Sequence, residues 1–205
     1  MFLDRALHEE PQEIQQRFYK WYSFMMKNIE FGKFVSVLHT KNHCAHVLLY
    51  NLKMAKMANL DEDGITVLCK ASVFHDSRRQ DDTRDVGHGA RAAENYRSFC
   101  DRGLVDFDER VYLIMAYHDR DDGIGKNAFR EKGLADAIPL YDLFKDADAL
   151  DRWRISPTAL DTKYLRTPWS KTLVQYAKDL VKETVGKSLW EDAVKQTKIN
   201  KSKAR

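Results

Sequence analysis

The dipeptide His75-Asp76, at the end of the apolar run 67–74, is the part of this sequence best suited to chemistry. Four further ionisable residues lie at long spacing on either side of it: His43, His88, His118 and Asp148. Each stands on a stripe of apolar residues at three- and four-residue spacing, the pattern of a helix face that packs inward. One histidine on such a stripe is more often an ordinary core residue than a ligand.

The carboxylates are the unusual members of this set, because burying a carboxylate is costly unless it is paired or binds a metal. Several imidazoles with two carboxylates form a nitrogen–oxygen donor set that divalent metals bind. Five segments that each bring such a residue to an inward face are better explained by one shared metal site than by five accidents. The sequence therefore predicts a divalent metal site, without distinguishing Mn, Ni, Fe, Mg or Zn. The remaining histidines are expected to be ordinary surface residues: His8, His39 and His46.

Helices must position these residues. The 205-residue chain has only nine Gly and four Pro, and no segment alternates with period two. We therefore predict an all-α fold, a single bundle of about seven helices. Caps, proline and glycine place the helix starts near Pro11, Thr40, Asp61, Gly87, Asp106, Ala135 and Thr167. The Gly- and charge-rich segment 119–133 is expected to be a mobile loop.

Three parts of the chain are distinguished by their composition. Residues 1–38 are expected to form a helical extension packed on the core, 39–185 the main domain, and 186–205 a helix end with a basic tail. The first long helix has aromatic residues on nearly all sides, so part of it is expected to pack on a partner chain, which leaves a homodimer open.

Charge and hydropathy exclude several classes of function. The net charge of +3 is too small to favour nucleic acid as a partner. No run of 18 apolar residues predicts a membrane span, and the N-terminus has no apolar signal region. The three cysteines form no CxxC pair and are expected to be buried thiols in a reducing compartment. We therefore expect a cytoplasmic protein.

Five short strings carry a family resemblance. They are His43-Cys44-Ala45-His46-Val47, Phe74-His75-Asp76, Gly87-His88-Gly89-Ala90, Ala116-Tyr117-His118-Asp119 and Ala147-Asp148-Ala149-Leu150. In this order, over about residues 40–154, the chain resembles the HD-domain metal-dependent phosphohydrolase superfamily. The resemblance implies an HD-domain fold. The last string favours Asp148 as the ligand, with Asp146 as the fallback.

The resemblance also implies how metal would be held. One ion would take His43, His75, Asp76 and Asp148, and a second would take His88 and His118, with Asp76 as the bridge. Many members with a single ion use the residue equivalent to His88 only to contact substrate. The Gly-Tyr-Pro signature of cyclic-dinucleotide phosphodiesterases is replaced by Lys126 and Asn127 at its last two positions.

The implied activity is hydrolysis of a phosphomonoester or phosphodiester in a small phosphorylated metabolite such as a nucleotide, by metal-activated water. The expected catalytic residues are Asp76, Arg79, His88 and His118. The expected substrate-binding residues, at the lip of the site or one helical turn from Asp148, are Arg78, Arg79, Lys145 and Arg152. Two alternatives remain: a di-iron oxygenase of the same fold, and a non-catalytic HD binding module.

Overall fold

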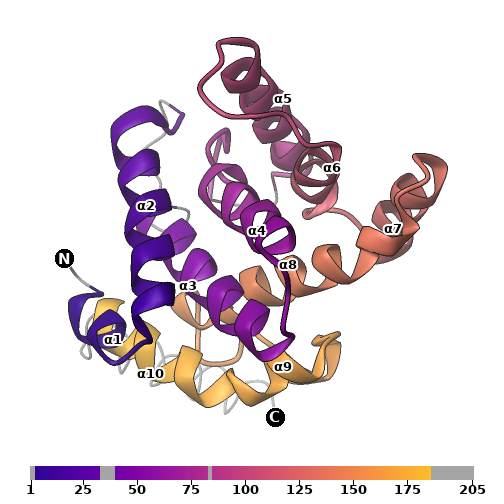
Figure 1. The fold of residues 1–205 in the computed structure, drawn as a ribbon. Helices are drawn as coiled ribbons and strands as arrows, with labels where there is room; N and C mark the ends of the chain where they lie inside the picture. Colours follow the sequence, from indigo (N-terminus) through magenta and orange to yellow (C-terminus); the bar gives the residue numbers. More distant parts are fainter. Residues whose placement is uncertain (1–2, 33–39, 83–84, 186–205) are drawn as a thin grey trace.

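A computed structural model of the chain describes residues 3–32, 40–82 and 85–185 (Figure 1). Within these residues there are ten α-helices, three short 3₁₀ helices and no strand. The α-helices are α1 (Asp4–His8), α2 (Gln12–Asn28), α3 (Lys41–Met57), α4 (Glu62–Phe74), α5 (His88–Asp101), α6 (Glu109–Tyr117), α7 (Asp122–Glu131), α8 (Ile138–Leu150), α9 (Pro168–Thr172) and α10 (Val174–Val185). The all-α prediction is confirmed, but the expected number of about seven helices is too low.

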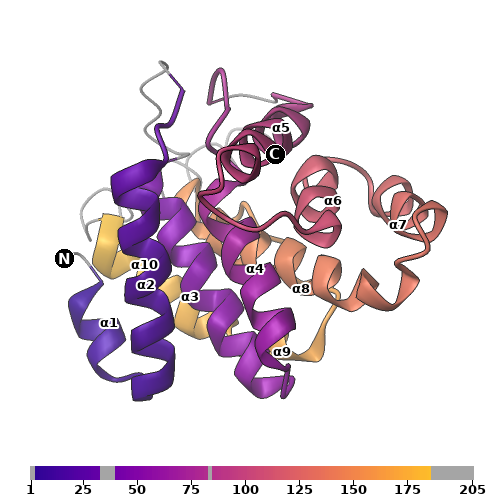
Figure 2. The same cartoon turned by 45° about the horizontal axis from the view of Figure 1, so that its top comes forward.

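Helices α3 and α4 form the centre of the bundle. In α3 every residue from His43 to Leu52 is buried, and in α4 every residue from Val67 to Phe74 is buried. A helix that is apolar all round is covered on all sides. Accordingly α2 lies on one side of this pair and α5 and α6 on the other (Figures 1 and 2), while α8 packs against both α3 and α4.

The N-terminal segment shares this core. Helix α2 begins after Pro11, as predicted, and buries Ile14, Phe18, Trp21 and Met25. The short helix α1, which the sequence did not predict, adds Leu3 and Leu7 to the same hydrophobic cluster. An ion pair of 3.7 Å between Arg5 and Glu183 places α1 beside α10. Residues 33–39, with His39, and the basic tail 186–205 lie outside the described residues.

Most helix starts follow the predicted signals. The Thr40 side chain accepts from the backbone N–H of His43, and the Asp61 side chain accepts from that of Gly64 at 2.8 Å. Gly87 precedes α5 with a φ of 98°, a backbone conformation that favours glycine. The expected cap Asp106 is wrong, because α6 is capped by Asp108.

The segment 119–133 is not a mobile loop. It contains α7, capped by Asp121, whose side chain accepts from the backbone N–H of Gly123 at 2.8 Å. A Cβ on Gly125 would lie 2.2 Å from the hydroxyl of Tyr141, so glycine is what lets α7 pack against α8. The burial of Phe129 completes this contact.

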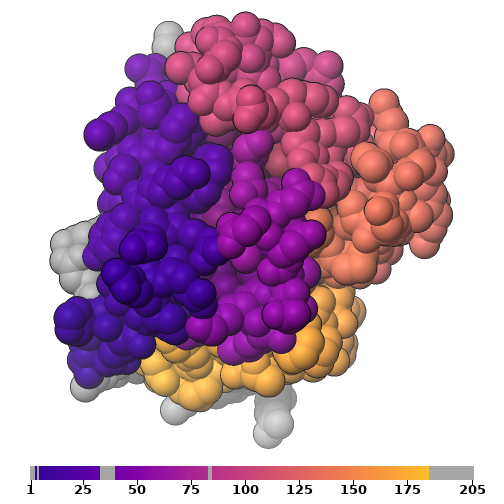
Figure 3. All heavy atoms as spheres, in the orientation of Figure 1, coloured from indigo at the N-terminus to yellow at the C-terminus, as the bar shows by residue number. Residues whose placement is uncertain are grey.

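Helix α7 projects at one edge of the molecule (Figure 3). The predicted last helix starts after Thr167, as expected, but it is divided into α9 and α10 at Leu173. No helix among the described residues is both long and apolar enough to cross a membrane. Cys44 and Cys69 are buried free thiols, as predicted, whereas Cys100 is only partly buried.

Candidate metal centre

The six predicted ligands come from five helices and meet at the centre of the bundle. His43 lies in the first turn of α3, His75 and Asp76 directly follow α4, and His88 opens α5. His118 directly follows α6, and Asp148 lies in the last turn of α8. The first five side chains are buried, and about one third of the Asp148 side chain is exposed. All six ligands therefore lie at or next to helix ends that meet in the bundle centre.

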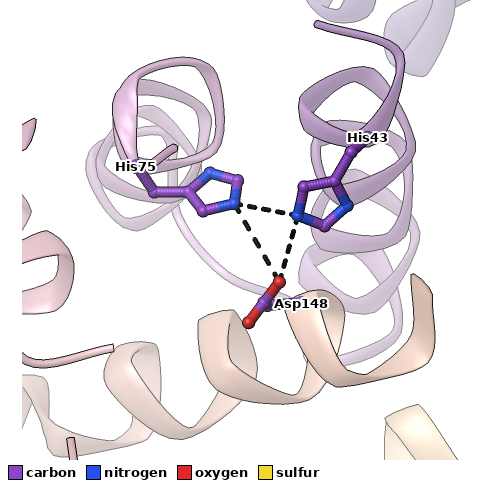
Figure 4. Close-up of side chains that lie close together, drawn as sticks. All are labelled: His43, His75 and Asp148. Atoms are coloured by element: carbon purple, nitrogen blue, oxygen red, sulfur yellow. Dashed lines mark hydrogen bonds and ion pairs between the residues drawn. The ribbon is translucent and has the colours of Figure 1, made fainter. Parts of the chain in front are cut away.

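The first half of the centre joins His43, His75 and Asp148 (Figure 4). Nε2 of His43 lies 3.1 Å from Nε2 of His75 and 3.1 Å from Oδ1 of Asp148. The distance from Nε2 of His75 to Oδ1 of Asp148 is 4.0 Å. Oδ2 of Asp76 faces the same point, 3.5 Å from Nε2 of His43 and 3.9 Å from Nε2 of His75.

The second half joins His88 and His118, whose Nε2 atoms are 2.9 Å apart. The other carboxylate oxygen of Asp76, Oδ1, lies 3.1 Å from Nε2 of His88 and 3.9 Å from Nε2 of His118. Asp76 therefore presents one oxygen to each half, which is the geometry of a bridging ligand.

All four histidines have their second ring nitrogen fixed. Nδ1 of His43 lies 2.7 Å from Oδ2 of Asp151, and the other three Nδ1 atoms each face a backbone carbonyl. These distances are 2.9 Å for His75 to Ser72, 2.6 Å for His88 to Asp85 and 2.7 Å for His118 to Met115. Carbonyls and carboxylates only accept, so each Nδ1 carries a proton. The lone pair of each neutral ring then lies on Nε2 and points into the centre.

Two Nε2 lone pairs about 3 Å apart repel each other unless a proton or a cation lies between them. In the first half the pKa values of the two rings shift in opposite directions. Burial lowers the pKa of His75 to about 3. Burial also acts to lower the pKa values of His43 and His118. The carboxylates of Asp148 and Asp151 beside His43, and the negative charge of Asp76 near His118, outweigh burial and raise both pKa values.

The two halves fit divalent ions. Metal–nitrogen and metal–oxygen bonds of about 2.0–2.2 Å allow two ligands of one ion to be at most about 4.4 Å apart. The distances among His43, His75 and Asp148, and those among Asp76, His88 and His118, are all within 4.0 Å. Four neutral imidazoles and two carboxylates also match the donor preference of manganese, iron, nickel or zinc.

His46 was expected at the surface, but it is buried. Its Nδ1 lies 2.6 Å from Oδ1 of Asp151, whose other oxygen holds His43. Burial acts to raise the pKa of Asp151, but His46, His43 and Arg154 hold it well below the usual range. Asp151 was not identified from the sequence, because no pattern links it to residues of α3 more than one hundred positions away.

Asp146, the fallback ligand, has a different role. Its buried carboxylate accepts from the backbone N–H groups of Arg166 and Thr167 and from the hydroxyl of Ser170, at 2.7–3.0 Å. It thereby fixes the segment that enters α9. The geometry favours Asp148 over Asp146 at the centre.

Gly89 sets the distance between the helices of the second half. A Cβ at this position would lie 2.3 Å from the carbonyl oxygen of Met115 and 2.9 Å from Nδ1 of His118. Neither contact is possible without movement. The missing side chain therefore allows α5 to approach α6 closely enough for His88 and His118 to face each other.

A cavity of about 790 Å³ opens above the centre, with Asp76, His88, His118 and Asp148 in its lining. Six cationic side chains line it as well: Arg79, Arg120, Lys145, Arg152, Arg154 and Arg166. The carboxylate Asp119 was missed by the sequence reasoning and also lines the cavity. It accepts from the backbone N–H of Gly87 and lies 3.4 Å from Nδ1 of His88.

Three of the four predicted substrate-binding residues line this cavity. Nη1 of Arg79 lies 3.2 Å from both ring nitrogens of His88, and Lys145 and Arg152 lie on the rim side of Asp148. The prediction that Arg78 binds substrate needs correction, because Arg78 is not among the residues that line the cavity. Its guanidinium donates to the carbonyl of Glu30 and the side chain of Asn95.

Comparison with family models, with curated proteins and with solved structures finds no match for this chain. The case for a function therefore depends on the residues and their geometry.

Proposed function

We propose that this protein is a metal-dependent phosphohydrolase of the HD type, acting on a small phosphorylated metabolite such as a nucleotide. The observation that carries the proposal is the placement of Asp76. One of its oxygens faces His43 and His75, and the other faces His88 and His118. This arrangement suits two ions held side by side, below a cavity whose lining includes six cationic side chains and, besides the ligands, four aspartates.

His43, His75, Asp76 and Asp148 would hold the first ion, and Asp76, His88 and His118 the second. Divalent ions in such sites supply an activated water and neutralise charge on phosphoryl oxygens. The fixed Nδ1 hydrogen bonds keep every imidazole in the required tautomer and orientation. The burial of the ligands limits competition from bulk water.

Cationic side chains around the centre would bind and orient the phosphoryl group. Three of these cations stand two or three residues from a ligand in the sequence and line the cavity near its floor: Arg79, Arg120 and Lys145. Guanidinium groups bind phosphate oxygens in pairs, and the lysine ammonium acts as a point charge. The carboxylate of Asp119 borders the same floor and can accept a proton from a group bound there.

The same ligand set also suits iron, so an HD-type di-iron oxygenase is the second candidate. Apart from the ligands, six cationic side chains and four aspartates line the cavity, and this excess of positive charge favours chemistry on an anionic phosphoester. Oxygen uptake with iron, compared with phosphate release with manganese, distinguishes the two activities.

The first test is the metal content of protein purified without chelator, by elemental analysis. Two ions per chain are expected, with one in His88→Ala. Manganese-loaded protein is then assayed for phosphate release from nucleotides, phosphomonoesters and phosphodiesters. His75→Ala and Asp76→Ala are expected to lose metal and activity, whereas His8→Ala, an exposed histidine on α1, serves as the matched control.

Each result has a defined meaning. One ion that His88→Ala does not remove would refute the two-ion arrangement and leave His88 as a substrate contact. Iron with substrate-dependent oxygen uptake would favour the oxygenase. Absence of metal even after addition of manganese would refute both activities in favour of a binding module.

A further inference from the structure

The cavity above the metal centre has two chemically different sides. Its floor carries the ligands and the nearby cationic groups. The other part of its lining comes from residues 155–164, which lie between α8 and α9 in the chain. The uncharged residues of this segment in the cavity lining are Ile155, Thr158, Ala159, Leu160 and Tyr164. We call these five residues the uncharged wall; the charged residue Asp161 also lines the cavity, next to Leu160.

The uncharged wall is held in place at both ends. Near its start, Nε of Arg152 donates to the carbonyl of Ala159 at 3.0 Å. Beyond its end, Arg166 is fixed to the buried Asp146 through both its backbone and its side chain. Leu160 and Leu165 are anchored in the core. The wall is therefore built before a ligand arrives.

Apolar side chains are exposed on this fixed wall. Tyr164 is 67% exposed and Ile155 is 41% exposed, and both line the cavity. Val86, which is 45% exposed, lines the cavity too. Single exposed apolar residues are ordinary on a protein surface. Three of them around one cavity that also holds convergent charged groups are typical of a ligand site.

We propose that Tyr164 and Ile155 determine the specificity of the enzyme by binding the planar organic group of the substrate, the base of a nucleoside phosphate. This inference rests on the proposed phosphohydrolase function, in which the floor holds the phosphate. Tyr164 offers an aromatic face on which a base can stack. The hydroxyl of Thr158 offers a hydrogen-bonding group for the polar edge of a base, whereas the carboxylate of Asp161 is already engaged by the backbone N–H and the ammonium group of Lys163.

The test compares two kinds of substrate that share a phosphomonoester: nucleotides, which carry a base, and a sugar phosphate, which does not. The full manganese-loaded chain is assayed with the four common ribonucleoside 5′-monophosphates and with ribose 5-phosphate. For Tyr164→Ala, the ratio of kcat/KM for nucleotide to kcat/KM for ribose 5-phosphate is expected to fall about tenfold. Tyr164→Phe keeps the ring and should keep the ratio. Tyr19→Ala removes an exposed tyrosine of α2 outside the cavity and serves as the control.

A binding measurement separates this inference from the proposed function. Equilibrium dialysis with adenosine 5′-O-thiomonophosphate should show about tenfold weaker binding to Tyr164→Ala and unchanged binding to Tyr164→Phe. Tyr164-dependent binding without phosphate release from any substrate would refute hydrolysis and keep the base-binding assignment. An unchanged substrate ratio in Tyr164→Ala, or an equal loss in Tyr164→Phe, would overturn the assignment of Tyr164.

Discussion

Substitution of Gly89 by alanine tests whether the second half of the centre depends on the close approach of α5 and α6. The added Cβ would lie 2.3 Å from the carbonyl oxygen of Met115, whereas ordinary contact begins at 3.4 Å. One of the two helices must therefore move by about 1 Å. Metal ligands tolerate displacements of only about 0.2 Å. Because the Met115 carbonyl also accepts from Nδ1 of His118, the displacement reaches that ligand directly.

Gly89→Ala is therefore expected to lower the metal content from two ions to one and the rate of phosphate release by about 100-fold. The effect on folding should be small. Overpacking costs about 1–3 kcal/mol, while alanine at a helical position regains about 1 kcal/mol over glycine. Elemental analysis and thermal unfolding followed by circular dichroism measure the two effects separately.

Ala90→Ser, at the exposed neighbouring position, is the matched control and should retain both ions. The reasoning fails if Gly89→Ala keeps two ions and full turnover. Loss of both ions in a folded variant would also contradict it, because the atoms nearest the added methyl group belong to Met115 and His118 and not to the ligands of the first half.

Three further perturbations test other contacts of the centre. Asp151→Asn removes the charge that orients His43, so we expect the manganese affinity of the first half to fall 10–100-fold in chelator competition. Asp146→Asn, in helix α8, should destabilise the fold and leave that affinity unchanged. Arg79→Gln removes a cation 3.2 Å from both ring nitrogens of His88. Calorimetry should then show tighter binding of the second ion, and the activity assay a higher KM. An unchanged affinity would mean that the guanidinium does not compete with the second ion. Because the pKa values of His43 and His118 are raised, the folded metal-free chain keeps protons on these rings above pH 6.5. It loses these protons as the pH rises through the raised pKa values. Manganese must displace these protons, so its affinity should rise with pH above 6.5, and calorimetry at pH 7 in two buffers of different ionisation enthalpy should detect proton release.

The sequence was sufficient to predict where a helix starts when the capping side chain lies at the start of that helix. Thr40 and Asp61 cap α3 and α4 through their own side chains, and the contacts are local. The predicted ligands meet because each lies on a buried stripe near a helix end, and five stripes of one bundle must face one core.

Predictions failed where the deciding contact is remote in the sequence. Gly125 has the appearance of a helix breaker, but its lack of a side chain is what allows α7 to pack on Tyr141. His46 has the appearance of a surface residue until Asp151 is brought beside it from the far end of α8. Arg78 follows the His75-Asp76 pair closely, but its hydrogen bonds turn it towards Glu30 and Asn95.

The convergence of ligands from five helix ends has a consequence for folding kinetics. His43 and Asp148 are separated by about one hundred residues, and the ligands of the second half come from two more helices between them. Closing loops of that length has a large entropic cost, so the complete ligand set exists only once most of the bundle has formed. Metal would then stabilise the native state without assisting the early steps of folding. We expect manganese to slow unfolding and to leave the refolding rate unchanged in stopped-flow measurements, with faster refolding as the contrary result.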